Sequence, residues 1–249
     1  MRDVVLWRRL VAEYLGSAFL AAIVVGSGIA AQQLSPGNVG LELLQNALVT
    51  GAGLFAVILI FGSLSGAHFN PVVSFVDAAL GGISWRDAAA SLPAQVAGCI
   101  TGAIAANVMF SLKADSISTH DRASGPHLFS EAIATVGLLL VIFALARSEK
   151  TAYTPAAVGA YITAAYFFTS STSFANPAIT VGRVFSNTFA GIAPSSAPGF
   201  IAAQVVGGVV ACGLVMVLYP GLAEAESADI IVPHLRGTDQ PEPELDSAR

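Results

Sequence analysis

Residues 66–72, Gly-Ala-His-Phe-Asn-Pro-Val, and residues 174–178, Phe-Ala-Asn-Pro-Ala, decide how this chain folds. Each contains an Asn-Pro pair that follows a long apolar stretch. Asparagine is a favoured helix N-cap and proline a favoured first helical residue, so we expect short helices over about 70–79 and 176–186. Ten residues rise about 15 Å, which is half of the hydrocarbon thickness of a membrane. The sequence therefore predicts two half-membrane helices.

Six apolar stretches surround these motifs, in a chain that is 55% hydrophobic and 11% charged. A soluble chain carries about a quarter charged residues, whereas a stretch of roughly 17–25 apolar residues matches a helix that crosses a bilayer. We therefore expect an all-α membrane protein with six transmembrane helices. Their predicted ranges are about 10–31, 41–62, 88–112, 129–146, 154–170 and 198–219.

The two halves of the chain, about 8–111 and 128–219, repeat one order of landmarks: a buried glutamate, then Asn-Pro, then Ala-Gln-Val. Three spans per half is an odd number, so the second half is expected to be inverted relative to the first. The motifs lie in apolar connections that are too short for a full span, which predicts re-entrant segments. We expect one domain over 1–219, followed by an acidic, disordered cytoplasmic tail over 220–249.

Half-helices that enter from opposite faces would meet at their N-termini, with Asn70 and Asn176 facing each other at the membrane midpoint. Their positive dipole ends would repel a cation but not a neutral polar solute, and the two amides would offer hydrogen-bond donors. One Asn-Pro pair is an ordinary turn signal. Two pairs in an inverted repeat favour a pore for small uncharged solutes.

Residues 65–72 and 174–178 resemble the paired signature motifs of the aquaporin and glycerol-facilitator family, and the resemblance spans about residues 8–220. It implies six tilted helices, two re-entrant half-helices, and one pore per subunit of a homotetramer in the lipid bilayer. Val72 stands where the family mostly has alanine. The implied pore-motif residues are Asn70, Pro71, Val72, Asn176, Pro177 and Ala178.

Two glutamates, Glu13 and Glu131, lie inside predicted spans. A carboxylate there can relay protons or bind an ion, but the matching glutamates of the family brace the re-entrant loops by accepting backbone N–H bonds. We favour bracing, with Gln95 and Gln204 in a similar structural role. His68 is a candidate for the inner pore mouth, and nothing in the sequence supports a pH-sensing role for it.

The family narrows its outer pore with four residues, and their offsets fall here on Thr50, Ala164, Ser173 and Ile179. Ile179 replaces an arginine, so a fixed charge and five donors are absent at that position. We expect a wide, weakly polar filter that is not selective for water. It suits glycerol-like polyols, water and urea. The stretch 174–199 is also similar to a bacterial branch associated with arsenic resistance, so neutral arsenic or other metalloid hydroxides are a further hypothesis.

Arg183 lies one helical turn beyond Ile179. Two interpretations are open: it guards the outer vestibule, or it complements the negative C-terminal end of the half-helix. The sequence favours the second interpretation. Asp77 occupies the matching position in the first half, seven residues after its asparagine.

A passive channel is the favoured class of protein, and a secondary transporter with inverted repeats is the alternative. The sequence shows no nucleophile–base pair and no cluster of metal ligands that would indicate an enzyme. We expect no metal, no cofactor and no nucleic-acid partner. Basic residues favour one side by eight to three. The positive-inside bias then predicts a multi-pass protein of the inner (plasma) membrane with both termini in the cytoplasm.

Overall fold

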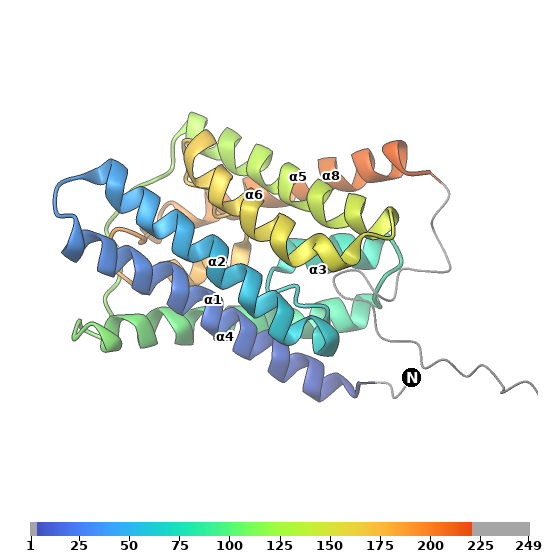
Figure 1. Ribbon diagram of the computed structural model, residues 1–249, viewed down its shortest axis with the longest axis horizontal. Coiled ribbons are helices and arrows are strands. Elements are labelled where there is room, and N and C mark those ends of the chain that lie inside the picture. Colours follow the sequence, from blue (N-terminus) through green and yellow to red (C-terminus); the bar gives the residue numbers. More distant parts are fainter. Residues whose placement is uncertain (1–3, 221–249) are drawn as a thin grey trace, which may run out of the picture.

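The computed structural model describes residues 4–220, which form a bundle of α-helices (Figure 1). The predicted tail lies outside the described residues, apart from Pro220. The two short helices are α3 (Pro71–Ala79) and α7 (Pro177–Arg183), and a single 3-10 turn, Thr151–Tyr153, precedes α6. The long helices are α1 (Leu6–Leu34), α2 (Val39–Ser65), α4 (Trp85–Met109), α5 (Gly125–Arg147), α6 (Thr154–Phe168) and α8 (Ala197–Leu218).

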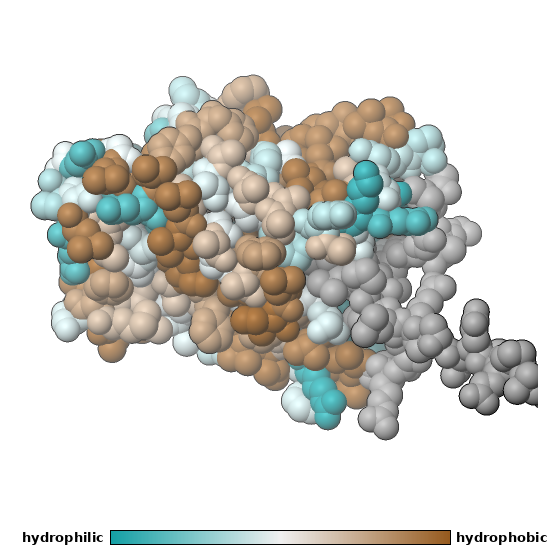
Figure 2. Space-filling model, in the orientation of Figure 1, coloured by the Kyte–Doolittle hydropathy of each residue, from teal (hydrophilic) through white to brown (hydrophobic). Residues whose placement is uncertain are grey.

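Each of the six predicted apolar stretches coincides with most of one long helix, which confirms the predicted all-α fold. Five of these helices are long and apolar enough to cross a membrane. The sixth, α6, has 15 residues and rises about 22 Å. Hydrophobic side chains cover much of the face seen in Figure 2, while hydrophilic groups gather toward the two ends of the bundle. Such a surface suits lipid rather than water along the sides.

The two halves pack in the same way. In the first half α1 packs on α2 and α4, and in the second half α5 packs on α6 and α8. The halves join where α2 meets α6. Each short helix also contacts a long helix of the opposite half, since α3 packs on α8 and α7 packs on α4. The core is therefore one continuous structure shared by both halves.

Glycines let α1 and α4 cross closely. A Cβ atom added at Gly98 or Gly102 would collide with the backbone carbonyl of Tyr14 or Ala18 on α1. Small residues at such crossings are typical of helices packed in membranes, where close backbone approach supplies the contact energy. This crossing fixes α1 beside the loop that precedes α3.

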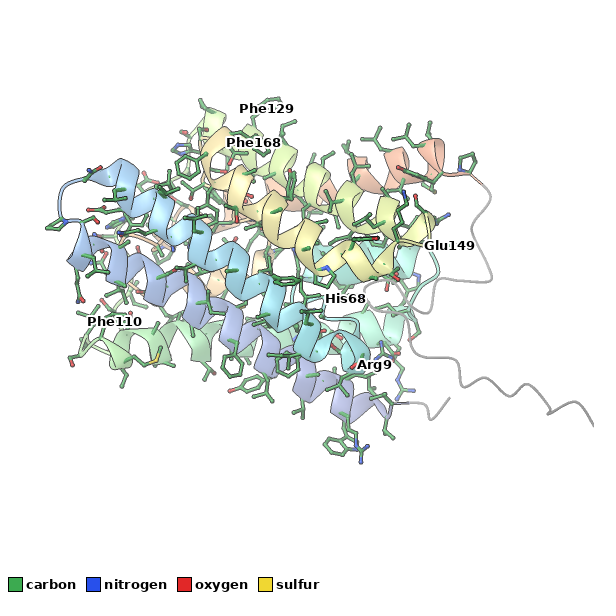
Figure 3. All side chains as sticks on the ribbon, in the orientation of Figure 1. Arg9, His68, Phe110, Phe129, Glu149 and Phe168 are labelled. Carbon is green, nitrogen blue, oxygen red and sulfur yellow. The ribbon has the colours of Figure 1, made fainter. Side chains whose placement is uncertain are left out.

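The course of α1 and α2 distinguishes the two ends of the bundle. The N-terminal end is where α1 begins and α2 ends, and it carries Arg9 and Glu149 in Figure 3. The far end is where α1 ends and α2 begins, and it carries Phe110, Phe129 and Phe168. His68 lies between them, nearer the N-terminal end.

Candidate functional site

Each short helix begins at an asparagine followed by proline. The Oδ1 atom of Asn70 accepts a hydrogen bond of 3.0 Å from the Val72 amide, and Oδ1 of Asn176 accepts bonds of 2.9 and 3.2 Å from the amides of Ala178 and Ile179. The α3 range agrees with the prediction. The predicted end of the second half-helix at 186 is wrong, because α7 ends at Arg183 and the chain then turns.

The two helix starts meet through a reciprocal pair of hydrogen bonds. Nδ2 of Asn70 donates to the carbonyl of Ala175 at 2.7 Å, and Nδ2 of Asn176 donates to the carbonyl of Phe69 at 2.8 Å. Each asparagine thus caps its own helix and contacts the loop that leads into the other helix. The positive ends of both helix dipoles consequently lie together inside the bundle.

The loops before the asparagines hold an unusual backbone. Ala67 and Phe69 have φ values of 49° and 48°, and Ser173 and Ala175 have values of 49° and 46°. Residues with a side chain rarely adopt this left-handed region, which costs about 1–3 kcal/mol each where the surroundings enforce it. In both halves the left-handed residues are the first and third of the three that precede the asparagine. Other contacts must offset the cost of this backbone conformation.

In the first half, Glu13 of α1 supplies these contacts. Its carboxylate accepts hydrogen bonds from the amides of His68 and Phe69 at 3.0 and 2.7 Å. It also accepts bonds from the Ser65 hydroxyl at 2.6 Å and from Nε2 of Gln95 at 2.8 Å. Buried carboxylates are stable only when several donors occupy their oxygens. The arrangement favours a bracing role over proton relay.

In the second half, Glu131 of α5 occupies the equivalent place. It accepts hydrogen bonds from the amides of Phe174 and Ala175, both at 2.9 Å, and from Nε2 of Gln204 at 2.6 Å. Glu131 and Gln204 are fully buried. The two glutamates therefore hold the two strained loops by the same pattern of bonds.

A narrow cavity of about 60 Å³ surrounds the asparagine pair. That volume exceeds the roughly 10–15 Å³ needed to admit a single water molecule, so the cavity is large enough to be hydrated. Among the predicted pore residues, Pro71, Val72, Pro177 and Ala178 are buried behind the cavity wall. The wall is mostly apolar and is formed by Leu20, Val24, Thr50, Leu54, Ile58, Ala67, His68, Asn70, Val73, Leu138, Ile142, Val158, Ile162, Tyr166, Ser173, Phe174, Asn176, Ile179 and Arg183.

Three of the four predicted filter residues, Thr50, Ser173 and Ile179, line this cavity. The prediction for Ala164 is wrong, because its side chain is exposed on the outer face of α6. The cavity instead receives Tyr166 from α6, whose hydroxyl lies 3.3 Å from Oγ1 of Thr50. The wall is bulkier and more polar here than the four predicted residues indicated.

Arg183 at the end of α7 is 2% exposed and lines the cavity at its far end. Its Nε donates a hydrogen bond to the carbonyl of Ala190, and its guanidinium lies 3.4 Å from the ring centre of Phe174. The side-chain bond thus goes to the loop beyond α7 and not to the carbonyls of α7 itself. This geometry favours a position of Arg183 at the outer vestibule, whereas the sequence had favoured an interaction with the C-terminal end of the half-helix.

Outside the cavity lies a second, wider pocket of about 270 Å³ at the far end. Arg183 lines both spaces and therefore marks their junction. Sequence reasoning missed Arg122 as a second cation here, because nothing local relates residue 122 to residue 183. The wall of this outer pocket is formed by Val39, Leu43, Asn46, His120, Arg122, Thr172, Arg183 and Phe189.

Toward the N-terminal end the cavity wall carries His68. Its Nδ1 lies 3.1 Å from the Ser74 hydroxyl, and its Nε2 lies 3.4 Å from Oδ2 of Asp77, which is 1% exposed. Nε2 of Gln95 donates to the same Ser74 hydroxyl at 3.0 Å. The sequence identified His68 but not its partner, although an aspartate on a buried half-helix was a usable signal.

These features define a class: a helical membrane protein in which two inverted half-helices meet inside a cavity. A family model described as Major intrinsic protein matches residues 1–174 and 156–240. The chain therefore belongs to the major intrinsic protein family.

Individual relatives agree with this assignment. The chain is 48% identical over 214 residues to Aquaglyceroporin AqpS of Rhizobium meliloti (strain 1021), which covers 86% of this chain and 91% of that protein. It is 30% identical over 166 residues to Aquaporin NIP3-1 of Oryza sativa subsp. japonica, covering 65% of this chain and 52% of that protein. The X-ray structure of the aquaglyceroporin from Plasmodium falciparum has a similar fold, with a TM-score of 0.68 at 22% identity over 89% of this chain and all of that one.

Proposed function

We propose that the protein is a passive channel, and not an enzyme, that passes small uncharged solutes through the cavity around Asn70 and Asn176. The observation that carries the proposal is the reciprocal bonding of these asparagines at two abutting helix starts. Two positive dipole ends beside a narrow, mostly apolar wall oppose cations while leaving neutral solutes free to pass.

The solutes we propose are glycerol-like polyols, water, urea and neutral arsenic or other metalloid hydroxides. All present oxygens that can accept bonds from the few polar groups in an otherwise apolar wall, such as Thr50 and Tyr166. The similarity to Aquaglyceroporin AqpS supports glycerol in particular. The cavity is small enough that a polyol would shed most of its water and depend on those polar groups.

A secondary transporter is the alternative class, and it requires a charged coupling site that faces the solute path. Among the described residues that line the cavity there is no carboxylate. The oxygens of Glu13 and Glu131 are instead occupied by backbone and glutamine donors. This distribution supports passive passage.

The proposal is tested by flux through the purified protein in liposomes, measured for water, glycerol, urea and arsenous acid. We expect glycerol flux well above that of empty liposomes, without dependence on a proton or sodium gradient. Glycerol flux no greater than in empty liposomes would overturn the proposal, and flux that stops when an ion gradient is removed would favour the transporter.

A matched pair of bulky substitutions locates the path. Thr50→Trp places a large ring in the cavity, whereas Ala164→Trp places the same ring on the exposed face of α6. We expect the first to reduce glycerol flux at least about tenfold, which corresponds to a barrier of about 1.4 kcal/mol. The second is expected to leave flux unchanged.

We further propose a homotetramer in the inner membrane with both termini in the cytoplasm, so that the far end of the bundle faces outward. The row of exposed apolar residues on α8, including Val205, Val209 and Val217, supports burial in lipid or against a neighbouring subunit. Native mass spectrometry in detergent measures the subunit number directly.

A further inference from the structure

Arg183 is a buried cation that has no anionic partner among the residues that the structure describes. It is among the largest fully buried side chains of the described residues. The ion pairs found within residues 4–220 join Arg9 to Asp87, His68 to Asp77 and Lys113 to Asp115, and Arg183 takes part in none of them. A buried charge that lacks a counter-charge is costly and needs a reason.

The contacts of Arg183 leave much of its guanidinium uncommitted. Nε donates to the Ala190 carbonyl, and the planar group lies over the ring of Phe174 at 3.4 Å. Neither terminal nitrogen has a hydrogen-bond partner in the part of the chain that the structure describes. Since guanidinium has five N–H donors, those on the terminal nitrogens remain available to a molecule at the junction of the cavity and the outer pocket.

A second guanidinium, that of Arg122 on the loop before α5, lies beside the same aromatic ring. Nε of Arg122 donates to the Gly191 carbonyl at 2.7 Å, and one terminal nitrogen donates to the Phe189 carbonyl at 2.8 Å. Its guanidinium carbon lies 5.6 Å from the ring centre of the same Phe174. The loop beyond α7 and the Phe174 ring therefore hold both cations at one level of the bundle.

The outer pocket has a positive wall as a result. It is lined by both arginines and by Asn46, and the described residues that line it include no carboxylate. A cation that enters from the far end would meet two like charges inside a low-dielectric structure, where they act more strongly than in water. A neutral solute carries no charge for the two guanidinium groups to repel, and its oxygens could accept bonds from their N–H donors.

We propose that Arg183, with Arg122 adding a second positive charge to the outer pocket, is the specificity-determining residue at the entrance of the solute path: it binds the hydroxyl oxygens of entering neutral solutes and excludes cations. This inference rests on the proposed channel function. It places the fixed charge one helical turn outward from Ile179, so that a solute meets the guanidinium first, the apolar wall next and the two asparagines last.

The inference is tested with the full chain in liposomes by measuring glycerol flux and potassium permeability in parallel. Arg183→Leu removes the charge and all donors, Arg183→Gln removes the charge but keeps a donor for Ala190, and Arg183→Lys keeps the charge. We expect the Leu and Gln variants to raise potassium permeability at least tenfold. The Lys variant is expected to stay as impermeable to potassium as the parent chain.

Lys113→Gln is the matched control, because it removes an exposed positive charge from the same end of the bundle; potassium permeability is expected to be unchanged. If the Leu variant does not fold, the Gln variant decides the matter. A folded Gln variant that passes glycerol but remains impermeable to potassium would overturn the role of Arg183. Absence of glycerol flux in the parent chain would instead overturn the channel function itself, so the two failures are distinguishable.

Discussion

The two re-entrant junctions of this protein share one scaffold and differ in the charge that each presents. Both use a buried glutamate to bond the two amides before an asparagine, and both hold left-handed residues at matching positions. Seven residues past the asparagine, however, the first half has Asp77 and the second has Arg183. The shared features support the backbone, and the differing features distinguish the two ends of the solute path.

The two charges also differ in how they are compensated. Asp77 lies beside His68, with 3.4 Å between Oδ2 and Nε2, and belongs to a network with Ser74. Within residues 4–220, Arg183 contacts an aromatic ring and a backbone carbonyl but no carboxylate. A paired charge contributes to the structure, whereas an unpaired charge that lines a cavity is available to a permeating molecule. The comparison thus assigns a structural role to one end and a selective role to the other.

The largest expected effect concerns the shared scaffold. Glu131→Ala would leave the amides of Phe174 and Ala175 buried without acceptors, and Glu13→Ala would do the same to those of His68 and Phe69. At about 1–3 kcal/mol per orphaned donor, we expect each change to lower the free energy of unfolding by about 2–6 kcal/mol. Thermal unfolding in detergent measures it.

The exposed Glu149 provides the control for that measurement, and Glu149→Gln should change the midpoint little. If the two glutamates are equivalent, the two alanine variants should lose similar stability. A loss confined to one half would break the proposed equivalence of the junctions.

A smaller effect is expected at the charge that has a partner. Asp77→Asn keeps the size of the side chain but weakens the contact with Nε2 of His68, which is already long. We expect a loss of about 1 kcal/mol of stability and no change in potassium permeability. Arg183→Gln is the contrasting variant, because it is expected to raise potassium permeability. A potassium leak in the Asp77→Asn variant would contradict the assignment of selectivity to the far end.

The smallest effect is expected from pH at the far end. Partial burial, and then the neighbouring charge of Arg122, lower the pKa of His120 below its ordinary value of 6.5. His120 is therefore neutral at pH 7 and gains a positive charge only in more acidic solution, where it would add to the positive wall of the outer pocket. In the leaky Arg183→Gln variant, acidification on that side should reduce potassium permeability by less than about fivefold.

Glycerol flux should not follow this pH change, because glycerol carries no charge. His120→Gln in the same background should abolish the response. A response that persists without His120 would assign it to another group.

The sequence predicted those features of the site whose causes are local. Asn70 and Asn176 start helices because an amide caps the amides that follow and proline fixes the next residue, so their neighbours in the chain suffice to explain them. The repeated order of a buried glutamate, an Asn-Pro pair and Ala-Gln-Val then indicated that the chain consists of two similar halves. The inverted fold followed from counting spans, and membership of the family confirms it.

The sequence could not predict the rotation of α6. Ala164 was assigned to the cavity as the family's filter position on the fifth span, and nothing in the sequence marks how that helix is rotated about its axis. Two residues along a helix turn through about 200°, so a small error in the assigned position exchanges the inner and outer faces. Tyr166 is buried and Ala164 exposed for this reason.

The sequence also could not predict the backbone of the two loops or the contacts between distant segments. The left-handed residues Ala67, Phe69, Ser173 and Ala175 are not glycines, so no residue type indicated their backbone. The environment of Arg183 depends on how the chain folds back to bring Ala190 against it. The spacing in the sequence placed Arg183 one helical turn past Ile179 but gave no information about the residues that surround its side chain.

The reciprocal bonds between the asparagines and the opposite loops have a consequence for biosynthesis. They join residues 105 and 107 positions apart, and a ribosome adds about 5–20 residues per second. The first re-entrant segment must therefore wait roughly 5–20 s after its own synthesis before its partner exists. During that interval the side-chain amide of Asn70 lacks the acceptor that Ala175 provides in the complete chain, so the first junction can reach its final structure only after the second has been synthesised.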